Sequence, residues 1–216
     1  MACSGEGLGI KVLPDPEFNP TEETARPFGG LTDTSGMTIN YSGTSMGNAE
    51  IRDLRRIFTT RLDTLEHILA VGEKHLSDID ASLSARLAPD MLPLGAQIAF
   101  ACNQPRGFAY WCAGQAIDNL DPDVTSIVIA RSYIRDTQSR LDAIEVSDLK
   151  LDEMKQTGLG PGLYCETSGR LYVSDYLVPN FYFHITTTYA ILRMLGVPLG
   201  KADYMRFLMP HVKQAP

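Results

Sequence analysis

Three polar side chains recur at every fourth position in an otherwise apolar segment near the C-terminus. Asn180, His184 and Thr188 belong to the stretch PNFYFHITTTYAILR, residues 179–193. This spacing places them on one face of a helix, and the apolar residues around them predict that the helix is buried. Because buried polar groups are costly without a partner, these side chains must meet another side chain, a water molecule or a ligand. The histidine titrates near neutral pH and suits proton transfer.

A second set of polar residues surrounds the start of an earlier apolar segment. Arg86 and Asp90 belong to the run ARLAPDMLPLGAQI, and Gln97 follows Asp90 by about two helical turns. A buried amide needs hydrogen-bond partners, and His184 is the natural candidate. Arg86 and Asp90 have two interpretations: a helix cap with a surface ion pair, which contributes little stability, or residues at the rim of a cavity.

The residues available to hold a metal ion are too few. Catalytic zinc sites use about three His, Cys, Asp or Glu ligands, but the residue one turn after His184 is Thr188, a poor ligand. The cysteines form no CxxC pair, which disfavours a zinc ribbon or a thioredoxin-like motif. We expect Cys102 and Cys112 to be buried thiols. The sequence therefore predicts no metal site and no other cofactor.

Four segments have the hydrophobic spacing of long helices. The second contains Pro105, where a kink or break is expected, and the fourth stops at Gly196. Four such helices predict an all-α fold, a four-helix bundle. Their approximate ranges are 48–76, 90–112, 121–145 and 180–195.

Two further segments lie outside these helices. Leu163–Glu166 and Arg170–Val173 flank Thr167-Ser168-Gly169, a pattern typical of a β-hairpin before the last helix. Residues 1–47 are rich in Pro, Gly, Ser and Thr and lack a helical period, which favours an irregular N-terminal extension; a lid over a pocket is the alternative. The bundle domain is then 48–216.

The composition indicates a single globular domain. The chain has 216 residues, 44% of them hydrophobic, and a net charge of -7. Because nucleic-acid binding needs a basic face, we expect no nucleic-acid partner. No apolar run approaches the roughly 20 residues of a membrane-spanning helix, and the start lacks the pattern of a secretory signal. We therefore expect a cytoplasmic protein without a membrane partner.

Two segments together resemble a known family. ARLAPDMLPLGAQI and PNFYFHITTTYAILRMLGVPLGKADY are similar to signatures of a branch of the DinB/YfiT-like superfamily, a domain-of-unknown-function family found in bacteria and fungi. The similarity covers roughly residues 48–208. It implies a DinB-like four-helix bundle with a pocket between the second and fourth helices. Such bundles often pair, so a homodimer is expected by analogy.

The resemblance also bears on the metal. Classical members bind a divalent metal through one histidine on the second helix and an HxxxH pair on the fourth. The matching positions here are Gln97, His184 and Thr188. The resemblance therefore implies that neutral polar residues replace two of the three ligands, while the polar pocket is kept.

These observations predict a metal-independent protein that binds a small organic molecule and performs acid–base chemistry of the isomerase, dehydratase or cyclase type. We expect His184 to carry the proton. One alternative is a non-catalytic binding or stress-response bundle whose polar residues form a closed core network. Another is a remnant divalent-metal site that pairs His184 with a carboxylate such as Asp90. The candidate catalytic residues are His184, Gln97 and Asp90, and the candidate substrate-binding residues are Asn180, Thr188, Arg86, Trp111 and Tyr189.

Overall fold

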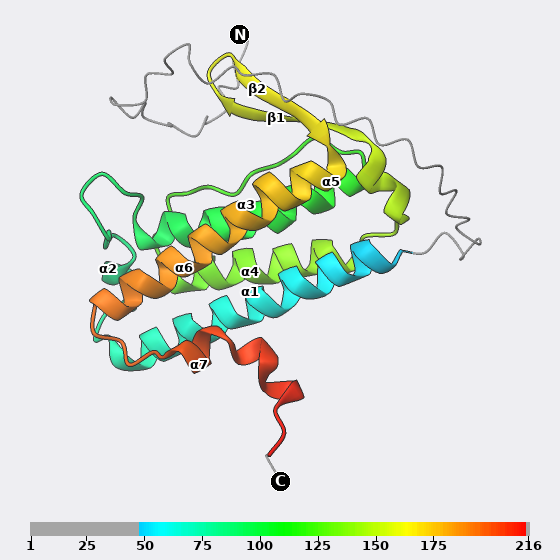
Figure 1. Ribbon diagram of the computed structural model, residues 1–216. Helices are drawn as coiled ribbons and strands as arrows, with labels where there is room; N and C mark the ends of the chain where they lie inside the picture. The colour runs from blue at the N-terminus through cyan, green and yellow to red at the C-terminus, as the bar shows by residue number, and fades with distance from the viewer. Residues whose placement is uncertain (1–47, 215–216) are drawn as a thin grey trace, which may run out of the picture.

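Four long helices lie side by side in the computed structural model, which describes residues 48–214 without the side chains of residues 159 and 160. Helix α3 packs against both α6 and α4, and α1 packs against α4 (Figure 1). The predicted helical bundle is confirmed, while the extension 1–47 and its suggested lid lie outside the described residues. The four helices are α1 (Ala49–His75), α3 (Leu94–Cys112), α4 (Ile127–Asp142) and α6 (Val178–Met194).

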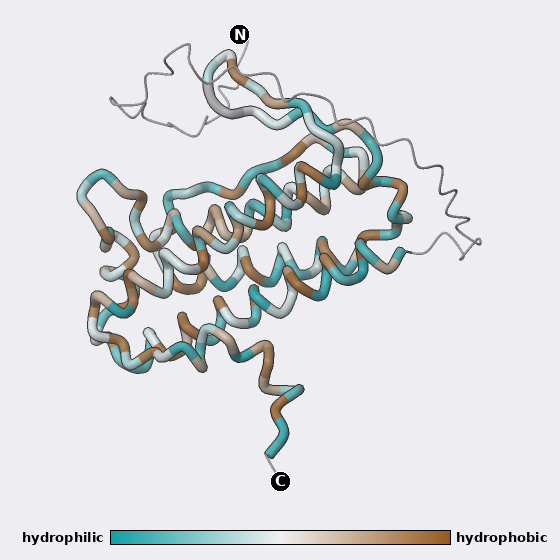
Figure 2. The backbone as a smooth tube through the Cα atoms, viewed as in Figure 1, coloured by the Kyte–Doolittle hydropathy of each residue, from teal (hydrophilic) through white to brown (hydrophobic). Residues whose placement is uncertain are grey.

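The helices differ in how much of their surface is buried. Helix α1 is amphipathic, and in Figure 2 hydrophobic and hydrophilic residues alternate along it. Its buried stripe includes Phe58, Leu62 and Leu65. Helix α3, which lies between α4 and α6, is buried at every position except Phe100. Polar residues on α3 must therefore find partners inside the protein.

Helix α3 begins and continues differently from the prediction. Its first residue is Leu94 and its N-cap is Pro93, with no side-chain cap. Asp90 therefore lies in the preceding loop and does not cap the helix. Pro105 does not break the helix, which continues to Cys112. The proline removes one backbone hydrogen bond, and the packing of α3 on both sides compensates for this loss.

Helix α4 also begins later than the Asp121-Pro122 signal predicts. The carboxylate of Asp121 accepts from the backbone N–H of Asp123 at 2.9 Å and forms a turn. The helix begins at Ile127, where the N-cap Ser126 accepts from the backbone N–H of Ile129 at 3.3 Å. Asp80, on the short helix α2 (Ile79–Ser82), accepts from the N–H of Ile127 at 2.7 Å. These contacts satisfy two free N–H groups of the first turn.

A two-stranded antiparallel hairpin precedes the last long helix, as predicted, but its strands are not those predicted. They are β1 (Met154–Gly160) and β2 (Leu163–Ser168), joined at Pro161-Gly162. The segment predicted as the second strand is helical, because the Ser168 hydroxyl accepts from the N–H of Leu171 and caps a new turn. This turn, α5 (Gly169–Leu171), leads through a π-helical segment, Tyr172–Leu177, into α6.

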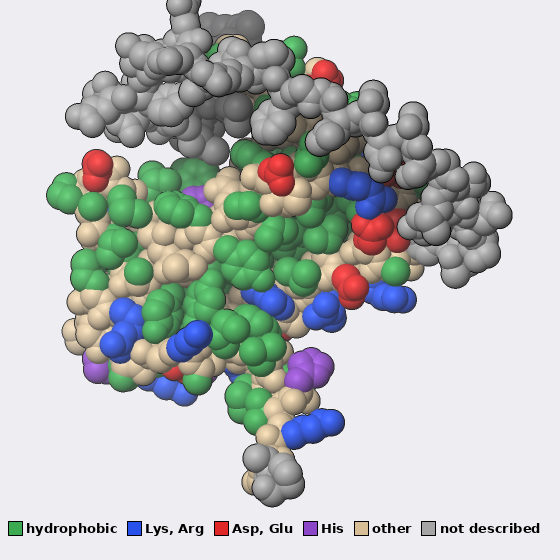
Figure 3. All heavy atoms as spheres, viewed as in Figure 1, with side chains coloured by type: hydrophobic (Ala, Val, Ile, Leu, Met, Phe, Trp, Pro, Cys, Tyr) green, Lys and Arg blue, Asp and Glu red, His purple; other side chains and the backbone are tan. Residues whose placement is uncertain are grey.

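The chain after α6 returns to the first helix. Gly196 has φ of 86° and ends α6. Helix α7 (Lys201–Tyr204) packs on α1, where Asp203 pairs with His67 at 2.8 Å. On the face seen in Figure 3, hydrophobic side chains gather over α6 and beside the C-terminal segment. No helix within residues 48–214 combines the length and apolar composition needed to cross a membrane.

Two glycines of α3 give a paired stability prediction. A Cβ at Gly107 would meet only Ile117, at 3.8 Å, so Gly107→Ala is expected to raise the free energy of unfolding by about 0.5–1 kcal/mol through better helix propensity. A Cβ at Gly95 would lie 2.7 Å from the backbone oxygen of Val124. Gly95→Ala is therefore expected to lower the free energy of unfolding by about 1–3 kcal/mol. Urea denaturation measures both, and effects of the same sign would contradict the packing of α3 on the 120–126 segment.

Candidate functional site

The best-defined polar contact between α3 and α6 joins the two residues predicted to meet. Nδ1 of His184 lies 2.7 Å from Oε1 of Gln97. Gln97 is 1% exposed and His184 is 7% exposed. The Nε2 amide group of Gln97 donates to the backbone oxygen of Leu92 at 3.2 Å. The predicted contact of Gln97 with His184 is therefore confirmed, and it continues to the loop before α3.

This hydrogen-bond chain determines where the imidazole carries its proton. Because the amide nitrogen of Gln97 points to Leu92, its oxygen faces His184 and can only accept. Nδ1 of His184 must therefore be the protonated nitrogen, and Nε2 keeps its lone pair. Burial lowers the pKa of His184 from 6.5 to about 4, so the ring is neutral at pH 7. A neutral ring with a lone pair on Nε2 accepts hydrogen bonds and protons.

Two aromatic rings contact the imidazole of His184 and restrict its orientation. The ring of Phe100 stacks on His184, with centroids 5.3 Å apart and planes at 21°. The ring of Phe183 meets it edge-on, also at 5.3 Å. Phe183 is 54% exposed, so an apolar ring that contacts His184 also reaches the surface. Sequence reasoning missed Phe100, although it lies one turn after Gln97 and shares its face.

The polar stripe on α6 is present and differs in burial along its length. Thr188, one turn after His184, is fully buried, and its hydroxyl has no hydrogen-bond partner among the described residues. The neighbouring Thr187 donates to the carbonyl of Phe183 at 2.8 Å. Asn180 is half-buried and interacts with the phenol of Tyr176. The unsatisfied Thr188 hydroxyl costs about 1–3 kcal/mol in the folded protein.

Four other predicted site residues lie elsewhere. Arg86 and Asp90 are exposed in the loop before α3, and Arg86 donates to the backbone oxygen of Met91 at 2.5 Å. Trp111 lies at the far end of α3, roughly 20 Å along the helix from Gln97, against Tyr172 with centroids 5.5 Å apart. Tyr189 packs against Tyr204 of α7 at 5.7 Å. None of these four side chains makes a hydrogen bond, ion pair or ring contact with His184 in the described part of the chain.

The residues at the positions of the DinB-type metal ligands do not fit a metal ion. Oε1 of Gln97 already accepts the proton of His184, and the hydroxyl of Thr188 is a neutral, poor ligand. This leaves Nε2 of His184 as the one strong donor atom of the three. Within residues 48–214, no group of three or more His, Cys, Asp or Glu side chains is arranged to hold a metal. The alternative metal site would pair His184 with Asp90. This pair is unfavourable, because Asp90 is exposed in a loop while the ring of His184 is buried.

Two hollows of the described surface stand out, and His184 lines neither of them. One, of about 440 Å³, lies between the C-terminal ends of α3 and α4 and includes Tyr110 and Arg140. The other, of about 320 Å³, lies beside the first half of α1 and includes Ile57 and Arg170. His184 as a whole residue is 7% exposed.

The two cysteines expected to be buried are buried. Cys102 is fully enclosed, and Cys112 is 5% exposed. Burial raises the pKa of each thiol to about 12. Both are therefore protonated and unreactive at neutral pH.

Comparisons with known proteins agree with the fold. The family model described as a domain of unknown function, DUF1993, matches residues 54–205. The crystal structure of a DinB family member protein from Shewanella denitrificans is similar to this structure with a TM-score of 0.63 and 26% sequence identity. The similarity covers 75% of this chain and 96% of that one. No curated protein matches the sequence.

Proposed function

The chain belongs to the DUF1993 family of DinB-like domains, and from this premise we propose that it binds a small organic molecule at His184 without a metal ion. The observation that carries the proposal is the bond between Nδ1 of His184 and Gln97, 2.7 Å long, which directs the lone pair of Nε2 away from Gln97. A ring held in this way is ready to accept a hydrogen bond from a hydroxyl or N–H group. The buried Thr188 hydroxyl offers a second polar contact one turn away.

The chemistry of the proposed site is proton transfer. A pKa of about 4 makes His184 a weak base at rest. A guest that develops negative charge beside Nε2 would favour the imidazolium, because an opposite charge within a few ångströms raises the pKa of histidine. His184 would then take a proton during the reaction and return it afterwards, as isomerases, dehydratases and cyclases require. Gln97 would act as the positioning residue that holds the ring.

One observation favours a non-catalytic function as the second candidate. The contacts from Leu92 through Gln97 to His184 give both polar atoms of the amide side chain a hydrogen-bond partner, and neither of the two hollows described above includes the imidazole. A closed network of this kind can serve only to orient α3 against α6. Under this function a guest molecule has no place at Nε2, and the two candidates make opposite predictions.

Small molecules that co-purify with the protein distinguish the candidates. We expect native mass spectrometry of the gently purified wild type to detect a bound organic molecule that His184→Ala fails to retain. His75→Ala, which removes an exposed histidine on α1, should retain it. Circular dichroism should show that both variants fold. A folded His184→Ala variant that keeps the same molecule, or a wild type that binds nothing from a metabolite extract, would favour the structural network.

A further inference from the structure

The larger hollow is separate from His184 and has its own polar groups. It lies where α3 and α4 both end and where the chain leaves α4 through Ile144 and Glu145. Its volume of about 440 Å³ falls in the range of small-molecule sites, roughly 300–1,000 Å³. Cys112, Ile144 and Val146 contribute apolar wall, while Arg140 contributes a guanidinium.

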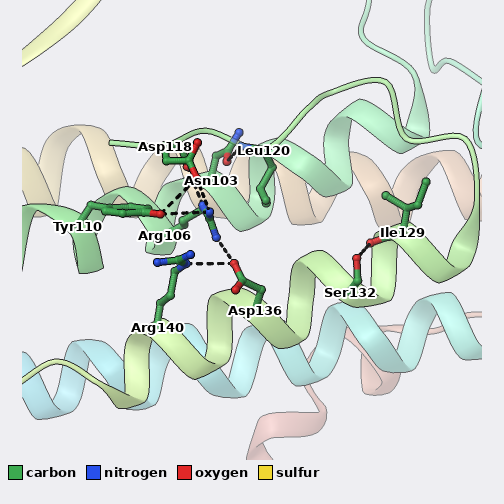
Figure 4. Close-up of polar contacts among 9 residues, drawn as sticks. All are labelled: Asn103, Arg106, Tyr110, Asp118, Leu120, Ile129, Ser132, Asp136 and Arg140. Carbon is green, nitrogen blue, oxygen red and sulfur yellow. Dashed lines mark hydrogen bonds and ion pairs between the residues drawn. The ribbon is translucent and has the colours of Figure 1, made fainter. Parts of the chain in front are cut away.

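Arg140 has hydrogen-bonding capacity to spare. Its Nε donates to Asp136 at 3.0 Å, and its guanidinium lies 4.7 Å from the centre of the Tyr110 ring. Figure 4 shows these contacts, with the guanidinium between Tyr110 and Asp136. Its two terminal amino groups donate to no other side chain or carbonyl in the described part of the chain. A guanidinium held by one edge, with the other edge free, is suited to a carboxylate.

The charges around the hollow favour a ligand without net charge. Arg106, which is 4% exposed, pairs with both Asp118 and Asp136. Together with Arg140, these groups form a cluster of two cations and two anions (Figure 4). Glu145 adds one carboxylate to the lining, and the C-terminal ends of two helices add partial negative charge. A ligand with only a negative charge would be repelled by this negative side of the hollow, whereas a ligand that also carries a positive group would pair with it.

We propose that this hollow binds a small zwitterion of the α-amino-acid class. The carboxylate of the ligand accepts from the terminal amino groups of Arg140. Its ammonium group faces Glu145, and its apolar side chain packs against Cys112, Ile144 and Val146. Binding here is independent of His184, because the hollow lies at the opposite end of α3 from Gln97.

An NMR titration with L-leucine, L-methionine and L-phenylalanine tests this site. We expect at least one probe to cause saturable amide shifts in Ala113 and Glu145, with no shift at His184. For the tightest probe, removing either charged group should weaken binding at least about tenfold. Two analogues of leucine each lack one charged group: 4-methylpentanoate lacks the ammonium, and 3-methylbutylamine lacks the carboxylate.

Substitutions of Arg140 and Glu145 test which side chain binds each charged group of the ligand. Arg140→Gln and Glu145→Gln should each weaken binding about tenfold or more, whereas Arg135→Gln, an exposed arginine on the same helix, should have no effect. Glu145→Gln keeps the test valid if loss of the Arg140–Asp136 pair unfolds the first variant. The proposal is overturned if none of the three probes reaches saturation by about 10 mM. It is also overturned if a single-charge analogue binds as well as its amino acid, or if Glu145→Gln binds normally.

Discussion

Replacing Phe181 with alanine is expected to lower the free energy of unfolding by about 3–5 kcal/mol. The Phe181 side chain is fully buried on α6 and meets Phe58 of α1 edge-to-face, with ring centroids 5.2 Å apart. Its removal leaves a cavity where α1, α3 and α6 come together, and loses an aromatic contact that adds to the burial. Urea denaturation followed by circular dichroism measures the change.

Phe183→Ala is the matched control for that experiment. Phe183 is two residues further along the same helix and is 54% exposed, so its truncation removes little buried area. We expect a loss below about 1 kcal/mol. Equal losses for Phe181→Ala and Phe183→Ala would mean that α6 presents a different face to the core.

The second large effect is a loss of stability in mild acid. The pKa of His184 is about 4 in the folded protein because of burial, against an ordinary value of 6.5. Between these two pH values the unfolded chain binds a proton that the folded protein does not bind. The stability that the neutral His184 ring contributes is therefore fully present above pH 6.5, and it is lost progressively as the pH falls to 4. The difference in pKa corresponds to about 3 kcal/mol.

His184→Asn isolates this contribution, because the amide can still donate to Gln97 but does not titrate. The free energy of unfolding, measured from pH 4 to pH 7 for both proteins, should decrease with acid by about 3 kcal/mol more in the wild type. The other histidines are the same in both proteins and cancel in the comparison. Parallel pH profiles would show that the His184 imidazole is not held neutral.

The contact between Gln97 and His184 was predictable because each polar residue lies in a helix that is otherwise apolar. A buried amide and a buried imidazole both need partners, and the spacing of the stripe on α6 placed His184 on the inner face. The end of α6 was predictable for a similar reason, since Gly196 tolerates the positive φ that stops a helix.

The elements and residues that the sequence analysis misplaced have different physical causes. Arg170–Val173 has strand-forming residues, yet the turn capped by Ser168 makes the segment helical. Trp111 shares the second helix with Gln97, but its distance along the axis carries it to the other end of the bundle. Pro105 stays inside a continuous helix because neighbours pack on both sides.

Arg106 shows why a buried charged residue is difficult to recognise from sequence when its partners lie far away in the chain. Nothing in its sequence neighbourhood distinguishes it from a surface arginine, and arginine is seldom fully buried without partners. Its partners Asp118 and Asp136 lie in a loop and on another helix. The hollow beside this cluster therefore became visible only in three dimensions.

The protonation of the His184 ring tests the central claim most directly. We predict that ¹⁵N NMR of the imidazole at pH 7 will show a neutral ring with its proton on Nδ1 and a lone pair on Nε2. The titration midpoint should lie at about 4, and Gln97→Met should remove the preference for Nδ1. A proton on Nε2, or a midpoint near the ordinary value of 6.5, would contradict the account.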